Sequence, residues 1–193
     1  MSAFTWREAL RENDRLECYN YGLNLLSRRA YTQVELKRKL SRRFPPALVA
    51  EALNRYAQLD LLNDERFALE YTREKRLAGY GIKWIRNQLR RRGVDRALID
   101  EVLSRESDDD MDTPLAQLSR QQEEEEARAR ILQLARRQWQ RHQKDDPYQR
   151  WRKVFAFLAR RGFPTSECKE IIDTLRQEET AEGDDIDFHE PFA

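Results

Sequence analysis

The fold is decided by Ile85–Val94 (IRNQLRRRGV), an apolar helical stripe that runs into paired arginines. The same pattern recurs at 36–44 (LKRKLSRRF) and at 154–163 (VFAFLARRGF). Apolar residues spaced by three and four positions predict helices. A second apolar triple follows each copy at the same offsets, at Val49, Ala52 and Leu53, at Ile99, Val102 and Leu103, and at Cys168, Ile171 and Ile172. The sequence therefore predicts a helix, a tight turn and a second helix, three times over.

Capping residues support these helix boundaries. Thr32–Glu35 (TQVE) has the pattern of a capping box, and Asp146–Pro147 combines an N-cap with a proline in the first turn. Gly93 and Gly162 lie where the C-terminus of a helix favours a left-handed residue. The first copy has Pro45–Pro46 in place of this glycine, so its turn is expected to be one residue shorter.

A further helix is predicted before each pair, at roughly 14–29, 64–78 and 113–143. The fold class is thus all-α, with tandem three-helix repeats that must stack because no repeat alone has enough apolar surface. The predicted organisation is an N-terminal segment with the first repeat (1–62), the second repeat (63–105), an acidic linker running into a long helix (106–126), the third repeat (127–177) and an acidic mobile tail (178–193).

The composition and the absence of known motifs exclude several classes of protein. The chain has 193 residues, of which 37% are charged and 39% hydrophobic, and its mean hydropathy of -0.94 excludes an integral membrane protein. No apolar signal sequence occupies Met1–Arg11, so we expect a cytoplasmic protein. Cys18 and Cys168 are expected to be small core residues without a disulfide, and two histidines provide no zinc-binding spacing. The motifs of nucleotide-binding loops and hydrolase or metalloprotease sites do not occur, so we expect no enzyme, no catalytic residue, no metal and no cofactor.

Basic residues are concentrated in the repeats. Residues 1–104 carry 21 Lys and Arg against 14 Asp and Glu, and residues 127–169 carry 12 against three. Such blocks favour a polyanionic or acidic partner, although an exposed helix face that keeps the protein in solution explains them too. The candidate contacts are Lys83, Arg86, Arg90, Arg91 and Arg92 in the second repeat, Lys37, Arg38, Arg42 and Arg43 in the first, and Arg160 and Arg161 in the third.

Two groups of aromatic residues allow both a structural and a binding role. In the third repeat the positions that match the basic stripe are Arg152, Phe155, Ala156 and Ala159, so charge is exchanged for apolar surface. Phe155 and Phe157 either pack in the core or form a docking patch. The second group could stack on the bases of single-stranded nucleic acid, although Tyr31 and Tyr80 precede a helix and could equally pack against its first turn. This group consists of Tyr31, Tyr80, Trp84, Trp139, Tyr148 and Trp151.

Residues 61–68 (LLNDERFA) carry a family resemblance. This segment resembles the RecX family, regulators of the RecA recombinase. The resemblance extends to the blocks 25–40 and 81–93, and to a third block with Leu158–Phe163, Ile171 and Leu175. The resemblance covers about residues 16–176. The missing glycine after Arg43 and the acidic stretch 107–126 depart from the family pattern.

The resemblance implies a bacterial cytoplasmic modulator built as an elongated, curved array. Family members bind the RecA filament on single-stranded DNA and restrain ATP hydrolysis, strand exchange and coprotease activity in recombinational repair and the SOS response. We expect a monomer that acts in this way. Two alternatives stay open: direct nonspecific DNA binding through a helix-turn-helix such as residues 82–103, and a helical-repeat scaffold for another partner.

Overall fold

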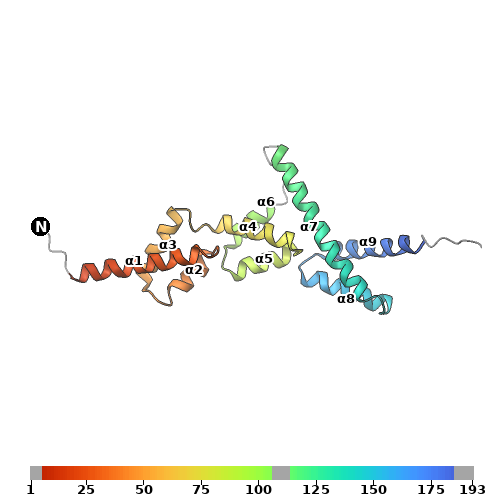
Figure 1. The fold of residues 1–193 in the computed structure, drawn as a ribbon, viewed down its shortest axis with the longest axis horizontal. Helices are drawn as coiled ribbons and strands as arrows, with labels where there is room; N and C mark the ends of the chain where they lie inside the picture. The colour runs from red at the N-terminus through yellow and green to blue at the C-terminus, as the bar shows by residue number, and fades with distance from the viewer. Residues whose placement is uncertain (1–5, 106–113, 185–193) are drawn as a thin grey trace, which may run out of the picture. The chain divides into compact units, whose positions relative to one another are not determined.

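The computed structural model describes residues 6–105 and 114–184, and every regular element within these ranges is a helix (Figure 1). The helices are α1 (Trp6–Leu26), α2 (Gln33–Leu40), α3 (Pro46–Gln58), α4 (Asp64–Leu77), α5 (Ile82–Arg91), α6 (Arg96–Arg105), α7 (Pro114–Arg141), α8 (Pro147–Arg160) and α9 (Thr165–Asp184). The all-α fold of three-helix repeats predicted from the sequence is therefore confirmed.

The first helix differs from its predicted range. It begins at Trp6 and ends at Leu26, whereas the sequence pattern placed it at about 14–29. Because residues 6–26 contain no proline and a single glycine, the helix can extend toward the N-terminus beyond the first apolar repeat position. It ends before Arg28, whose backbone N–H bonds to the carbonyl of Leu25 in the closing turn.

The predicted caps are present in the structure. The Thr32 hydroxyl accepts a hydrogen bond from the backbone N–H of Glu35 at 3.1 Å. The Asp146 carboxylate accepts bonds from the backbone N–H groups of the first turn of α8, the nearer at 3.1 Å. Gly93 and Gly162 have φ angles of 85° and 88°, in the region that residues with a side chain avoid. These local signals fix where α2 and α8 begin and where α5 and α8 end.

Contacts divide the chain into two compact units, and the division crosses the second repeat. Unit 1 comprises residues 1–72 and 87–107, and unit 2 comprises residues 73–86 and 108–193. The boundary therefore passes through α4 and through α5. Unit 1 holds the complete first repeat, unit 2 holds the complete third repeat, and each contains part of the second.

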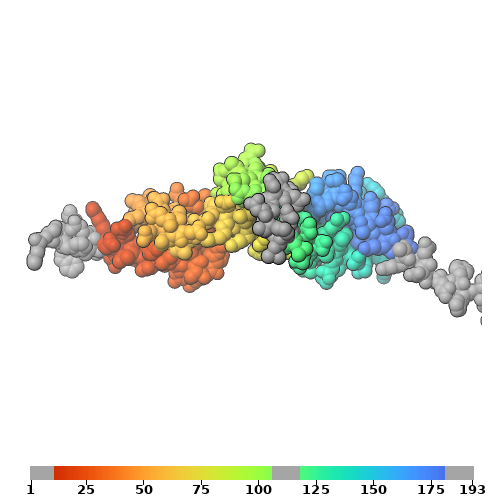
Figure 2. Space-filling view, turned by 90° about the horizontal axis from the view of Figure 1, so that it is seen from above, coloured from red at the N-terminus to blue at the C-terminus, as the bar shows by residue number. Residues whose placement is uncertain are grey.

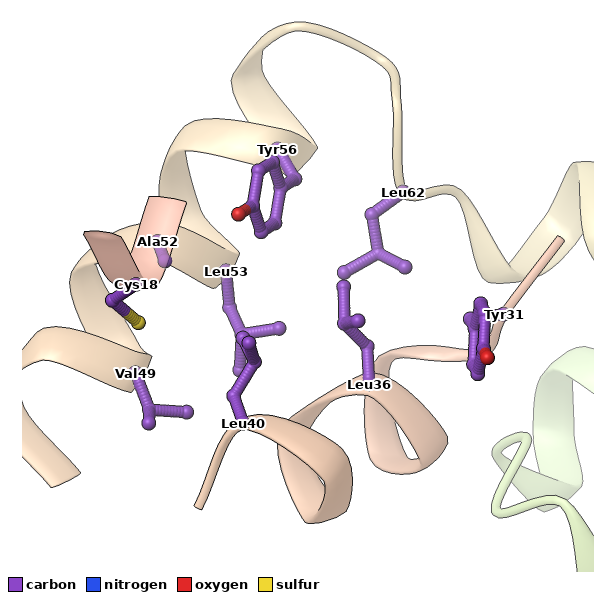
Figure 3. Close-up of a cluster of buried hydrophobic side chains, with 9 residues drawn as sticks. All are labelled: Cys18, Tyr31, Leu36, Leu40, Val49, Ala52, Leu53, Tyr56 and Leu62. Atoms are coloured by element: carbon purple, nitrogen blue, oxygen red, sulfur yellow. The ribbon is translucent and has the colours of Figure 1, made fainter. Parts of the chain in front are cut away.

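The core of unit 1 lies between α1, α2 and α3 (Figure 3). Leu36 and Leu40 of α2 are fully buried against α3. The hydroxyl of the buried Tyr56 donates a hydrogen bond to the carbonyl of Tyr19 at 2.6 Å, so this polar group has a partner inside the core. Cys18 is a small core residue, as predicted. The buried cluster consists of Cys18, Tyr31, Leu36, Leu40, Val49, Ala52, Leu53, Tyr56 and Leu62.

The LLNDERFA segment joins α3 to α4 within unit 1. The Asn63 side chain accepts a bond from the backbone N–H of Arg66 at 3.0 Å and so caps α4. The Asp64 carboxylate accepts one from the backbone N–H of Gln33 at 2.8 Å, although its burial raises the pKa of Asp64. Asp60 has a φ of 52°, and the Arg66 guanidinium donates to its carboxylate at 2.7 Å. The segment therefore fastens the start of α4 to the start of α2.

In unit 2, α7 lies directly against α8 and α9, as the adjoining green and blue surfaces in Figure 2 show. Val154, Leu158 and Cys168 are fully buried there. Phe155 and Phe157 are partly buried and pack against the same cluster. Of the two roles left open for these phenylalanines, packing on the core is the one observed.

A hydrogen-bonded network links α7, α8 and the second half of α9. The largely buried Arg150 donates from Nε to the carbonyl of Trp139 and from Nη1 to both oxygens of Glu179, each at 2.9 Å. These bonds from Arg150 lower the pKa of Glu179. Arg136 likewise donates to Glu178 at 2.7 Å. Helix α9 continues through Asp184, so the first residues of the predicted acidic tail are helical. Residues 185–193 lie outside the described chain.

Candidate polyanion-binding surface

In unit 1, the start of α2 and the end of α5 are held together. The Thr32 hydroxyl donates a hydrogen bond to the carbonyl of Arg92 at 2.6 Å, while it also accepts the capping bond of α2. Gly93 approaches Val34 so closely that a Cβ at this glycine would lie 2.5 Å from the Cβ of Val34. This junction brings the basic stretches of the first and second repeats together in one unit.

Arg92 is part of the packing of this junction. Its guanidinium lies over the ring of Tyr71, with 4.8 Å from Cζ to the ring centroid, and 5.5 Å from that of Phe67. It also donates to the carboxylate of Glu35 at 3.5 Å, and Arg29 donates to the same carboxylate at 3.2 Å. Arg92 is half-buried at this junction and directly follows the exposed candidate contacts Arg90 and Arg91.

The other candidate cations of unit 1 are exposed. Lys37 and Arg38 lie three and four positions after Val34, on the side of α2 that meets the α5 turn. Arg43 lies over the ring of Tyr21, with 4.7 Å between Cζ and the centroid. No ion pair with a described residue engages Lys37, Arg38, Arg42, Arg90 or Arg91. Their charges are therefore available to an anion from solution.

Unit 2 contains a second junction of the same kind. The backbone N–H of Gly81, at the start of α5, donates to the carbonyl of Arg161, at the end of α8, at 2.8 Å. The Arg161 guanidinium returns bonds to the carbonyls of Ala78 and Gly79 at 3.1 and 3.0 Å. A Cβ at Gly162 would lie 2.3 Å from the backbone nitrogen of Trp84. The start of α5 is therefore held against the turn at Arg161 and Gly162, as the start of α2 is held against the turn at Arg92 and Gly93.

Cations of two helices flank this second junction as well. Lys83 of α5 and Arg160 of α8 are exposed, and Arg86 is half-buried. Burial raises the pKa of the Cys168 thiol, and Lys83 opposes that rise, which places the lysine charge near the start of α9. The two junctions therefore repeat one arrangement, in which exposed cations of the middle helix accompany an arginine-rich turn.

Most of the candidate stacking aromatics are occupied within the fold. Tyr31 is buried beneath the guanidinium of Arg29, 3.6 Å from Cζ to the centroid. Tyr80 and Trp84 stack on each other with centroids 4.0 Å apart. Trp139 lies under Arg150, and Trp151 stacks on Phe155. Tyr148 differs, because 68% of its surface is exposed.

Helix α6 offers little to a DNA major groove. Its most exposed cation, Arg96, is 3.8 Å from the carboxylate of Asp100. Arg105 pairs with Glu101 on the same helix and with Glu65 of α4 at 2.5 Å. A recognition helix needs unpaired donors that reach base edges. The pairing of these arginines therefore favours a structural role for α6.

Sequence reasoning missed the anchoring function of Arg92, Arg161 and Arg150. The recurring Arg-Gly dipeptides at 92–93 and 161–162 were a usable signal, since they mark the turn that each junction holds. Arg150 gave no signal, because its acceptor Glu179 lies 29 residues further along the chain. Among the described residues, no His, Cys, Asp and Glu side chains are arranged to hold a metal ion. Nor is any described helix long and apolar enough to cross a membrane.

Comparison with known proteins identifies the repeats. Residues 18–55, 63–103 and 124–172 match the first, second and third three-helix domains of RecX. The regulatory protein RecX of Pseudomonas entomophila (strain L48) is 36% identical over 142 residues, 73% of this chain and 80% of that protein. The protein of the same name from Mycobacterium sp. (strain JLS) is 31% identical over 158 residues, 81% and 80% of the two chains.

A solved structure has the same fold. The crystal structure of RecX from Lactobacillus salivarius aligns with a TM-score of 0.65 at 25% identity, over 86% of this chain and 99% of that one. The ranges matched by the three RecX domains include the residues of both junctions. The chain belongs to the RecX family.

Proposed function

We propose that this protein regulates the RecA recombinase by binding the RecA filament on single-stranded DNA. Binding lowers ATP hydrolysis, strand exchange and coprotease activity, and so limits recombinational repair and the SOS response. Membership of the RecX family supports this function, and its relatives carry the name regulatory protein. The protein acts as a cytoplasmic monomer and without catalysis of its own.

The observation that carries the proposal is the repeated cation arrangement at the two junctions. In unit 1 the exposed cations of α2 accompany Arg90 and Arg91, and in unit 2 Lys83 accompanies Arg160. A filament of protein on a polyanion offers acidic side chains and phosphates together, and cations accelerate and strengthen association with both. The proposed contacts are Lys83, Arg86, Arg90, Arg91, Arg92, Lys37, Arg38, Arg42, Arg43, Arg160 and Arg161.

Direct binding to DNA is the second candidate. The stacked pair of Tyr80 and Trp84 stands beside Lys83, and aromatic rings next to cations are typical of proteins that hold single strands. In this case the protein would compete with RecA for the strand. The paired arginines of α6 argue against sequence-specific reading of a duplex.

Titration of the protein into RecA-catalysed, single-strand-dependent ATP hydrolysis separates the two candidates. The affinity of the protein for the same DNA is measured in parallel by fluorescence anisotropy. Inhibition at protein concentrations well below that of RecA, with weak DNA binding, is the expected result. Inhibition that appears only when the protein saturates the DNA would replace the proposal with simple competition. No inhibition at any ratio would favour a scaffold for another partner.

A further inference from the structure

Unit 2 contains a groove that the cation surface does not use. It has a volume of about 570 Å³ and lies between α7 and α9, with the turn from α4 to α5 at one end. This volume is within the range of sites that hold ligands or peptide side chains. None of the candidate cations lines it. A function for the groove is therefore separate from the proposed binding of the RecA filament.

The floor of the groove is apolar. Ile131 and Ile171 form its base, and both are almost fully buried. Phe163 and Leu132 are partly buried beside them. Ile82 stands at the edge of the groove with 41% of its surface exposed, although its neighbour Ile85 is fully buried. Water therefore touches apolar surface that a bound side chain could cover.

The walls of the groove carry excess negative charge. Glu124 and Glu125 of α7 lie on one side, and Glu167 and Glu170 of α9 on the other. The lining cations are two, Arg76 and Arg128, and Arg76 is 3.6 Å from the carboxylate of Glu124.

The two α9 carboxylates that line the groove repel each other. Burial and the neighbouring Glu170 raise the pKa of Glu167, and the nearby Arg76 and Arg128 only partly oppose this rise. A cation entering the groove would relieve the repulsion between Glu167 and Glu170.

From this combination we infer that the groove docks a basic, amphipathic segment of a partner protein. Apolar side chains of the segment cover Ile82 and the floor, while its Lys or Arg side chains pair with Glu167 and Glu170. The chain's own C-terminal stretch does not suit the groove, because residues 178–193 contain seven acidic residues and no Lys or Arg. Charge complementarity therefore favours a basic segment of another protein over the chain's own C-terminal stretch.

A designed peptide tests this docking site without knowledge of the natural partner. The probe is a fluorescein-labelled 16-residue amphipathic peptide of Leu and Lys, and its anisotropy is followed as full-length protein is added. A peptide of the same charge with Ser in place of Leu reports attraction by charge alone. The Leu-Lys peptide is expected to bind at least about ten times more tightly than the Ser-Lys peptide.

Two variants assign the binding to the groove. Glu167→Gln with Glu170→Gln removes two wall charges and should weaken Leu-Lys binding about five- to tenfold. The matched control, Glu17→Gln with Glu70→Gln, removes two exposed charges in unit 1 and should leave binding unchanged. Ile82→Ser keeps the net charge and should weaken binding of the Leu-Lys peptide alone. Circular dichroism confirms that each variant is folded.

Several results would overturn the inference. Equal weakening by the two glutamate pairs would show attraction to the whole protein, and an unchanged affinity of Ile82→Ser would remove the apolar contact. Absence of binding by the Leu-Lys peptide would dismiss the groove as a docking site. A concentration-dependent dimer in sedimentation that disappears in Glu167→Gln with Glu170→Gln would identify a second copy as the occupant. RecA inhibition by the groove variants is expected to equal that of wild type, so this test and the proposed function fail separately.

Discussion

Replacement of Gly162 by alanine tests the close contact that builds the junction in unit 2. The φ of 88° makes any L side chain unfavourable by about 1–2 kcal/mol. The new methyl group would also lie 2.3 Å from the nitrogen and 2.6 Å from the Cβ of Trp84. The backbone cannot rotate away as a side chain can, so overpacking adds about 1–3 kcal/mol. We expect Gly162→Ala to lower the free energy of unfolding by about 2–5 kcal/mol in total.

Gly79→Ala is the matched control for this prediction. Gly79 has a similar φ of 78°, but its nearest obstacle is the flexible end of Leu134 at 2.9 Å. The control should therefore lose only the conformational part, about 1–2 kcal/mol. Both variants are compared in urea unfolding followed by far-ultraviolet circular dichroism at neutral pH. Equal losses for the two variants would refute the close approach of the Gly162 turn to α5.

Three further substitutions test other parts of the structure. Thr72→Val should raise the free energy of unfolding by about 1 kcal/mol in thermal melts, because the Thr72 hydroxyl is buried without a hydrogen-bond partner among the described residues; a loss would contradict this. The pKa of Glu179 is lowered by Arg150 from an ordinary value of 4.5, so its stabilisation is present above that pH and disappears as the pH falls through the folded value. Glu179→Gln should therefore be less stable than wild type at pH 7, and the difference should shrink as the pH falls below 4.5 and through the folded value. A difference that does not shrink in acid would oppose the assignment. Arg92→Ala should cost about 1–2 kcal/mol in urea unfolding through lost packing on Tyr71, whereas the exposed Arg91→Ala should change stability by less than about 0.5 kcal/mol; similar losses would contradict the distinction.

The helices and their ends could be predicted because their signals are local. The cap at Thr32 and the turn at Gly162 depend on residues within a few positions, so the sequence pattern contains the information needed. The start of α1 was missed because the prediction began at the first apolar repeat position, although Thr5 with Glu8 three residues later has the sequence pattern of a capping box. Helix α9 extends into the stretch predicted as an acidic tail, where Glu178 and Glu179 pair with arginines of α7 and α8.

The roles of individual arginines could not be read from the sequence. Arg91 and Arg92 are adjacent, but Arg91 ends α5 and is exposed, whereas Arg92 lies in the following turn and packs. The surface that receives Arg92 comes from Tyr71 of α4. The groove of unit 2 likewise combines residues from 76 to 174, and no local pattern contains it. Basic stretches predicted a surface, but the arrangement at the junctions required the folded chain.

Inhibition of RecA by charge variants tests the proposed cation surface most directly. Alanine at Lys83, Arg86 and Arg90 together is compared with wild type and with a control that replaces three exposed cations of unit 2, Arg137, Arg141 and Lys144. The concentration for half-inhibition of single-strand-dependent ATP hydrolysis is measured after circular dichroism shows that both variants are folded. We expect half-inhibition to require at least about ten times more of the surface variant than of wild type, and the same amount of the control as of wild type. Equal inhibition by all three proteins would contradict the assignment of filament binding to this surface.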